Sequence, residues 1–173
     1  MKEFLAYVPT GSARYRERFG LDFEQFAVGL KFQHRPGLTL SQQDSRDECL
    51  DTLNQQMLHF DEQFATHTEW HKCLMDSTLT SKVVIGMTWK TFAKRTRLIG
   101  FDEITLTKPL FGGDTLYAES TILETADWPE DRHVGRLKVA TSGTNQRGEA
   151  VAKLVYDLLV TRAGQDRFAR ANY

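Results

Sequence analysis

The pattern of apolar and polar positions changes period along the chain and separates helices from strands. Between positions 42 and 57 apolar residues recur at helical spacing, and acids crowd the first turns after Ser41, a plausible N-cap. The longest helical signal follows a polar cap and predicts a central helix over about residues 78 to 95. Gly86 inside this helix predicts close packing against the backbone there, because glycine otherwise costs about 1 kcal/mol relative to alanine.

After Gly100 the period shortens, and β-branched and aromatic runs alternate with turn clusters. Three or four such strands in succession predict an antiparallel meander, and one more strand is expected before the first helix, in GLKFQHRPGLTL. A strand, an apolar helix and a meander together indicate an α+β fold. In this fold one antiparallel sheet wraps around one long central helix.

A chain of 173 residues is the size of one ordinary domain. The first part mixes arginines with phenylalanines and is expected to form a short helix or an extended arm that caps the domain. The last residues are polar. We therefore expect an N-terminal arm at 1–28, a single domain at 29–162 and a polar tail at 163–173.

Charge and cysteine content restrict the classes of partner and the cellular compartment that we expect. Lys and Arg number 22 against 23 Asp and Glu, for a net charge of -1, and no block of like charge is present, so nucleic acid is not an expected partner. Cys49 and Cys73 form no CxxC pair, which favours reduced thiols and a cytoplasmic protein. No stretch has the unbroken apolar character of a signal peptide or a membrane span, so no membrane association is expected.

The segment NQQMLHFDEQFA places His59 five residues after Asn54. A lone histidine near an apolar run is more often a structural group than a catalyst, so composition alone does not decide its role. His67 and His71 in HTEWH have the i, i+4 spacing of zinc ligands, but Thr68 stands where a metalloprotease motif needs Glu, and no metal is expected. The cysteines lack an obvious His and Asp partner order for nucleophilic catalysis.

Five stretches, in order, resemble the MaoC-like (R)-specific enoyl-CoA hydratase/dehydratase family. They are LTLSQQD, NQQMLHFDEQFA, DSTLTSKVVIGM, TKPLFGGDTL and TNQRGEAV. The resemblance covers most of the chain, from about Gly29 to Arg162. It implies a single hot-dog fold, a hydro-lyase activity on an acyl-CoA thioester, no cofactor beyond the coenzyme A of the substrate, and a homodimer or higher homo-oligomer.

The departures from the family pattern are informative. The catalytic aspartate of the family falls on Asn54 and its histidine on His59, so the acid of the acid/base pair is missing at this position. The HGM stretch of the family becomes Asp76, Ser77 and Thr78. This altered pattern resembles the branch that acts on short branched dicarboxylic CoA esters such as itaconyl-CoA, mesaconyl-CoA and methylmalyl-CoA.

Hydration of a C=C bond conjugated to a thioester assigns roles to these residues. The backbone N–H of Ser77, at the start of the central helix, is expected to hold the oxygen of the developing enolate. His59 is expected to carry the proton from water to the α-carbon, and Asn54 to orient the water. Asp76 and Thr78 are further candidates for contact with the substrate.

The residues leave the acyl group and two other functions open. A free carboxylate on the substrate needs a cation, and the candidates are Arg35, His71, Lys72 and Lys82. An acyl-CoA thioesterase on the same fold is one alternative, although no acid is found on the predicted central helix. A non-catalytic acyl-binding domain is the other, and the loss of the aspartate at Asn54 is the argument for it.

Overall fold

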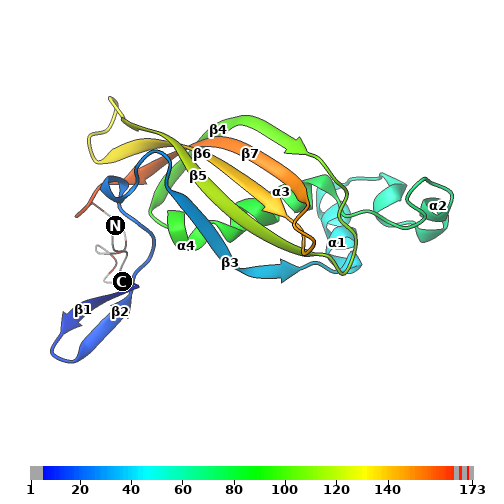
Figure 1. The fold of residues 1–173 in the computed structure, drawn as a ribbon, viewed down its shortest axis with the longest axis horizontal. Coiled ribbons are helices and arrows are strands. Elements are labelled where there is room, and N and C mark those ends of the chain that lie inside the picture. The colour runs from blue at the N-terminus through cyan, green and yellow to red at the C-terminus, as the bar shows by residue number, and fades with distance from the viewer. Residues whose placement is uncertain (1–5, 166–167, 169–170, 172–173) are drawn as a thin grey trace.

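A computed structural model describes residues 6–165 together with Phe168 and Ala171. Its main body is a five-stranded antiparallel sheet that curves around helix α3 (Ser77–Met87), as Figure 1 shows. The strands are β3 (Lys31–Thr39), β4 (Arg95–Leu106), β5 (Thr115–Asp127), β6 (Val134–Thr144) and β7 (Ala150–Thr161). Their order in the sheet is β3-β5-β6-β7-β4. This arrangement confirms the predicted α+β hot-dog fold.

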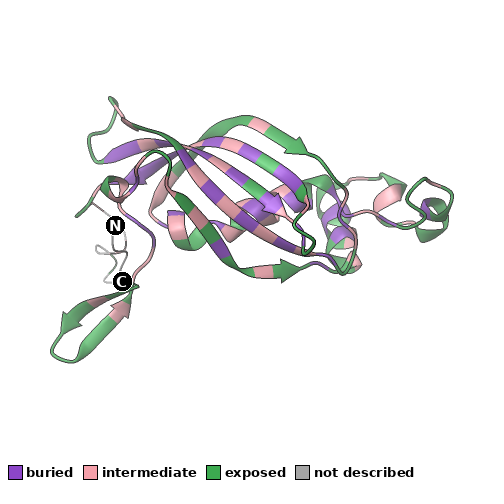
Figure 2. Ribbon diagram, in the orientation of Figure 1, coloured by how far each residue is buried: buried purple, intermediate pink, exposed green. Residues whose placement is uncertain are grey.

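The alternation of buried and exposed residues explains how the sheet holds the helix. In β5 the side chains of Leu116, Ala118 and Ile122 are buried and alternate with less buried neighbours, as Figure 2 shows for the sheet as a whole. Strands β5, β6 and β7 form the predicted meander, whereas β4 pairs with β7 at the far edge. The buried face of the sheet packs on Leu79 and Val84 of α3.

The central helix ends earlier than the predicted 78–95. After α3 a short helix, α4 (Trp89–Phe92), completes the helical segment, and β4 begins at Arg95. Thr88 lies between the two helices, is fully buried, and donates its hydroxyl to the carbonyl of Ile85 at 2.7 Å. Such a bond from a side chain to the preceding turn competes with regular helix geometry.

Two glycines show where the helix is tightly packed and where it is not. A Cβ atom at Gly143 of β6 would lie 2.9 Å from Val84 Cγ2, so the glycine permits the close approach of α3 to the sheet. Gly86 is exposed, and a Cβ atom there would meet nothing within 4 Å. The expectation that close packing accounts for Gly86 is therefore wrong.

A chain of buried hydrogen bonds crosses four neighbouring strands inside the sheet. His34 Nε2 lies 2.8 Å from Ser120 Oγ, which lies 2.7 Å from Thr141 Oγ1, which in turn lies 2.7 Å from the hydroxyl of Tyr156. All four side chains are buried. Each polar group has a partner, which is the condition under which a buried network stabilises a fold.

Burial lowers the pKa of His34 from 6.5 to about 4, with a further contribution from the charge of Arg35 and an opposing one from Glu119. The folded state thus favours the neutral ring, and the unfolded state binds more protons between these values. As the pH is lowered from 6.5 to 4, we expect the free energy of unfolding to decrease by at most about 3 kcal/mol. Urea unfolding at several pH values measures this loss, and a His34→Gln protein should lack most of the slope.

Near the N-terminus, β1 (Tyr7–Gly11) and β2 (Arg14–Glu17) form a separate two-stranded hairpin, which projects away from the sheet in Figure 1. A short 3-10 helix, η1 (Phe23–Gln25), follows. Beyond it Phe26 is buried and its ring stacks on Phe92, 5.4 Å between centroids. The arm predicted at 1–28 thus contributes to the core at its end.

Only part of the predicted polar tail is described. The ring of Phe168 stacks on Phe19 at 5.3 Å between centroids, while positions 166–167, 169–170 and 172–173 lie outside the described residues.

A third group of elements lies between β3 and α3 and protrudes from the end of the sheet at the right of Figure 1. It comprises α1 (Gln42–Thr52), η2 (Met57–His59) and α2 (Glu62–Thr66). Within the described part of the chain, no helix has the length and apolarity to cross a membrane. The cytoplasmic location predicted from the sequence remains a prediction.

Candidate active site

Helix α1 and the turn after it deliver the first candidate residue. Ser41 is confirmed as its N-cap: its hydroxyl accepts from the backbone of Asp44 at 3.2 Å, and Asp44 accepts in return from the backbone of Ser41. The C-cap of α1 is Leu53, whose φ of 57° is left-handed and rare for a bulky side chain. This turn directs the chain so that Asn54 faces the start of α3.

Both ends of the Asn54 side chain are held. Its Oδ1 accepts a hydrogen bond from the backbone N–H of Gln56 at 3.0 Å, and its Nδ2 donates to Oδ2 of Asp76. A carbonyl oxygen has two lone pairs, so Oδ1 keeps one for a water molecule. The amide therefore has a fixed orientation.

His59 lies at the end of η2 with its ring mostly buried, and the side chain of Gln42 in α1 donates to its backbone carbonyl at 2.9 Å. Its Nδ1 lies 3.3 Å from the backbone carbonyl of Leu74. A carbonyl can only accept, so Nδ1 is the donor, and in the tautomer that this contact selects Nε2 has the free lone pair. Nε2 lies 4.0 Å from Oδ2 of Asp76.

Asp76 is the N-cap of α3 and is only 1% exposed. Its Oδ1 accepts from the backbone N–H groups of Thr78 at 2.6 Å and Leu79 at 3.2 Å, and from the hydroxyl of Thr78. Burial alone would raise the pKa of Asp76, but hydrogen bonds from Thr78, Asn54 and the helix amides hold it below its usual range. The carboxylate is thus ionised at neutral pH.

Ser77 is the first residue of α3, as predicted. The backbone N–H groups of Thr78 and Leu79 bind Asp76, and that of Thr80 binds the carbonyl of Asp76 at 3.1 Å. The N–H of Ser77 has no hydrogen-bond partner among the residues that the structure describes. It is therefore free to donate to a ligand at the positive end of the helix dipole.

Asp76 and Thr78, the two further candidates for contact with the substrate, differ in solvent exposure. Asp76 is buried, whereas Thr78 is exposed and donates its hydroxyl to Asp76 and to Glu48 Oε1 at 3.2 Å. Only Thr78 presents a surface that a substrate can reach. Contact of either residue with a substrate remains a prediction.

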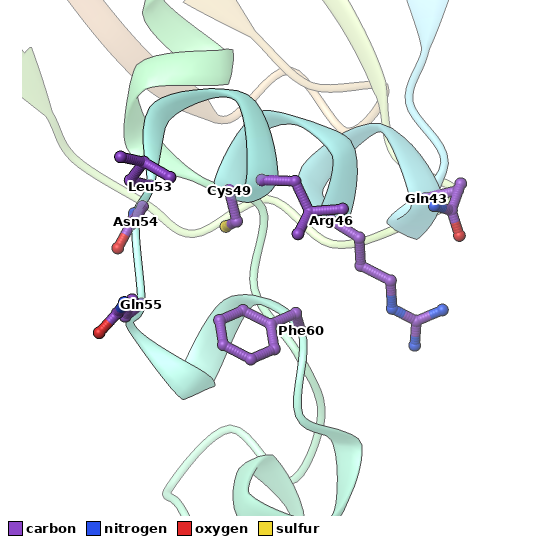
Figure 3. A pocket seen from close by; sticks show the side chains of 8 residues that line it. Gln43, Arg46, Cys49, Leu53, Asn54, Gln55 and Phe60 are labelled. Atoms are coloured by element: carbon purple, nitrogen blue, oxygen red, sulfur yellow. The ribbon is translucent and has the colours of Figure 1, made fainter.

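A cavity of about 400 Å³ opens beside Asn54, between α1 and the segment that ends at Phe60 (Figure 3). Its centre is apolar: Cys49 faces Phe60, and Leu50 also lines the cavity. Asn54 lies at one end, and the guanidinium group of Arg46 lies at the other. The lining is completed by Gln43, Leu53 and Gln55. The cavity adjoins the buried carboxylate, because Cys49 Sγ lies 3.9 Å from Oδ2 of Asp76.

Arg46 was not predicted from the sequence as a site residue. Arg46, Cys49 and the C-cap residue Leu53 have the i, i+3, i+7 spacing of one helix face. This spacing is the sequence signal that could have indicated Arg46 as a residue of the cavity lining. Its guanidinium group pairs with the carboxylate of Glu62, whose side chain is 68% exposed. An ion pair with so exposed a partner contributes little free energy, so its loss to another anion costs little.

The cations named from the sequence lie elsewhere. The guanidinium group of Arg35 lies 4.9 Å from the ring of Tyr117, and Lys82 pairs with the buried carboxylate of Glu48. His71 and Lys72 line a second cavity of about 470 Å³ near the N-terminal end of α1, together with Phe111. None of the four lines the cavity beside Asn54.

Other chemistry is less well supported by the geometry. His67 and His71 lie beyond the end of α2, so they do not share a helix face, and no cluster of three potential metal ligands occurs in the described part of the chain. Burial raises the pKa of both thiols, Cys49 and Cys73, and the charge of Asp76 adds to the effect on Cys49. A raised pKa reduces the thiolate that a nucleophile requires.

Several solved structures share this fold at low sequence identity. The monoamine oxidase regulatory protein from Archaeoglobus fulgidus is 24% identical over 84% of this chain and 97% of its own, with a TM-score of 0.75. A MaoC-like dehydratase from Rhodospirillum rubrum is 21% identical over 83% of this chain and 98% of its own, with a TM-score of 0.73.

A conserved hypothetical protein from Mycobacterium tuberculosis, described as having a double hotdog fold, is 18% identical over 84% of this chain, with a TM-score of 0.76. The match covers 45% of that protein, or about one of its two units. No functionally curated protein sequence matches the chain. The family model of the mesaconyl-CoA hydratases, however, matches residues 10–159. The chain therefore belongs to the mesaconyl-CoA hydratase family.

Proposed function

We propose that this protein is an enoyl-CoA hydratase/dehydratase that adds water reversibly across the C=C bond of an α,β-unsaturated acyl-CoA. The observation that carries the proposal is the orientation of His59. Its Nδ1 is bound to the carbonyl of Leu74, so Nε2 has a free lone pair beside the ionised carboxylate of Asp76. A neutral imidazole placed in this way is the base that hydration requires.

In the proposed mechanism, Nε2 of His59 takes a proton from water as the water oxygen attacks the β-carbon of the substrate. The electron pair of the C=C bond moves onto the thioester oxygen, and the N–H of Ser77 stabilises the resulting enolate. The imidazolium then returns the proton to the α-carbon as the enolate collapses. Asn54 orients the water, and no cofactor takes part beyond the coenzyme A of the substrate.

The family model and the cavity together support a short dicarboxylic acyl group such as that of mesaconyl-CoA. The apolar centre of the cavity suits a branched carbon skeleton, and Arg46 at its far end suits a free carboxylate. A guanidinium group binds a carboxylate through two parallel hydrogen bonds. Itaconyl-CoA also has a branched skeleton and a free carboxylate, and it is the second candidate.

We further propose that the protein is a homodimer. Strand β4 is an edge of the sheet and carries large exposed apolar side chains, namely Leu98, Ile99, Phe101, Ile104 and Leu106. Exposed apolar patches of this kind often mark interfaces, and the double hotdog fold of the mycobacterial protein pairs two such units in one chain. Light scattering should give twice the mass of one chain, and a fully active monomer at micromolar concentration would contradict the proposal.

One observation favours a thioesterase as the second candidate function. Asp76 places a carboxylate at the N-cap of the central helix, directly before the helical residues, which carry no acid. Its burial and its hydrogen bonds leave little access for a thioester carbonyl. Hydration therefore accounts better for the geometry.

The test is to mix the purified protein with mesaconyl-CoA, itaconyl-CoA and crotonyl-CoA. Hydration removes the absorbance of the conjugated thioester without releasing thiol. Hydrolysis releases free coenzyme A, and a binding domain changes neither signal. Free thiol released in step with the loss of absorbance would replace the hydratase proposal with the thioesterase.

A further inference from the structure

We infer that Asp76 is the positioning carboxylate of this site: it fixes the amide of Asn54 and stabilises the imidazolium form of His59. The inference deepens the proposed function and rests on it. It reassigns Asp76, which the sequence suggested only as a residue for contact with the substrate, and it supplies the acid that is absent at position 54.

The two oxygens of the carboxylate have different tasks. Oδ1 faces α3, where it accepts from the first turn of the helix. Oδ2 faces away from the helix, toward Asn54, His59 and Cys49. A helix cap requires only one oxygen, so the cap explains Oδ1 and leaves the second oxygen free to serve the site.

The distance from Oδ2 to Nε2 of His59 determines whether the carboxylate acts on the ring through a hydrogen bond or through its charge. At 4.0 Å the two atoms are too far apart for a hydrogen bond, so the lone pair of Nε2 remains available for water. They are close enough for the buried negative charge to attract the positive charge that develops on the ring as water is deprotonated. The carboxylate itself stays ionised, and the proton travels between water, Nε2 and the α-carbon.

The contact with Asn54 controls the water. An amide can be turned by 180° with little change in shape, and the hydrogen bond from Nδ2 to Asp76 selects the orientation in which Oδ1 accepts from Gln56. Asp76 is itself anchored, because its backbone N–H donates to Ser45 Oγ at 2.8 Å. Loss of the carboxylate would therefore release the amide as well as the charge.

Asp76→Asn separates this role from that of a helix cap, because asparagine caps helices as well as aspartate does. We expect Asp76→Asn to melt within a few degrees of the natural protein but to lose about 10- to 100-fold in kcat, with KM changed less than about threefold, as for the loss of a charged hydrogen bond. Asp76→Ala should lose thermal stability as well. The matched control is Asp131→Asn, which removes an exposed carboxylate 3.1 Å from His133 and should change nothing.

The double variant Asn54→Asp with Asp76→Asn provides the decisive measurement. It reverses the hydrogen bond between the two residues and returns one carboxylate to the site, so it should recover at least 10-fold in kcat over Asp76→Asn. Asn54→Asp alone places two carboxylates in contact and should be impaired. The inference is overturned if Asp76→Asn keeps more than a third of kcat, or if the folded double variant recovers nothing. A natural protein that hydrates none of the substrates would instead refute the proposed function.

Discussion

Replacing His59 by Gln is expected to lower kcat for hydration by about 100- to 10,000-fold, the usual contribution of general acid/base catalysis. Glutamine can still donate to the carbonyl of Leu74, but it has no basic lone pair and cannot take the proton of the attacking water. The fold should survive, because the ring lies at the margin of the core. Loss of enoyl-thioester absorbance measures the rate, and thermal melting measures the fold.

The chain contains a matched control for this change. His133 also has an aspartate beside it, since its Nδ1 lies 3.1 Å from Asp131, but its side chain is half exposed and far along the chain from the site. His133→Gln should therefore retain full activity. A His59→Gln protein that keeps more than about a tenth of the natural kcat would remove the imidazole from the mechanism.

The sequence predicted the layers of the fold because its periodicities are local. Alternation in the strands and helical spacing around Leu79 and Val84 are properties of short windows. The position of β4 was not predictable in this way: it follows α4 in the chain, yet pairs with β7 at the end of the sheet. The end of the central helix was missed because the helical pattern continues past Thr88, and only the tertiary structure shows that this residue is buried and bound to the preceding turn.

The candidate site was predicted in part for the same reason. Asn54 and His59 lie in one segment, and the start of α3 has a polar cap, so the sequence identified each piece. The contact between Asn54 and Asp76 joins residues 22 positions apart and has no local signature. Arg46 was missed because its pairing with Glu62 and its place in the cavity depend on how α1 packs against the following segment.

The second large effect concerns the substrate. Replacing Arg46 by Met should lower kcat/KM for mesaconyl-CoA by about 10- to 100-fold, which corresponds to the loss of hydrogen bonds to a charged group. Methionine keeps much of the length and apolar bulk of the arginine stem, so the cavity should retain its shape. The same change should alter kcat/KM for crotonyl-CoA by less than about threefold, since that substrate has no free carboxylate.

A matched pair of substrates makes this comparison sharper. The matched mesaconyl-CoA isomer is the one whose thioester is formed at C1, mesaconyl-C1-CoA. In tiglyl-CoA a methyl group takes the place of its free carboxylate, and the branched skeleton is otherwise the same. The ratio of kcat/KM for these two substrates therefore isolates the interaction of the carboxylate. Arg46→Met should bring this ratio close to one, and Arg46→Lys should restore part of it, since an ammonium group lacks the bidentate geometry of a guanidinium group.

Glu62→Gln distinguishes substrate binding from a structural role of the same arginine. If the ion pair of Arg46 with Glu62 served the fold, removing either partner would have a similar effect, whereas an exposed pair contributes less than about 1 kcal/mol. If Arg46 binds the substrate, removal of Glu62 frees the guanidinium group, and mesaconyl-CoA should bind as well or more tightly. If Arg46→Met lowers kcat/KM equally for mesaconyl-CoA and tiglyl-CoA, Arg46 does not bind the free carboxylate.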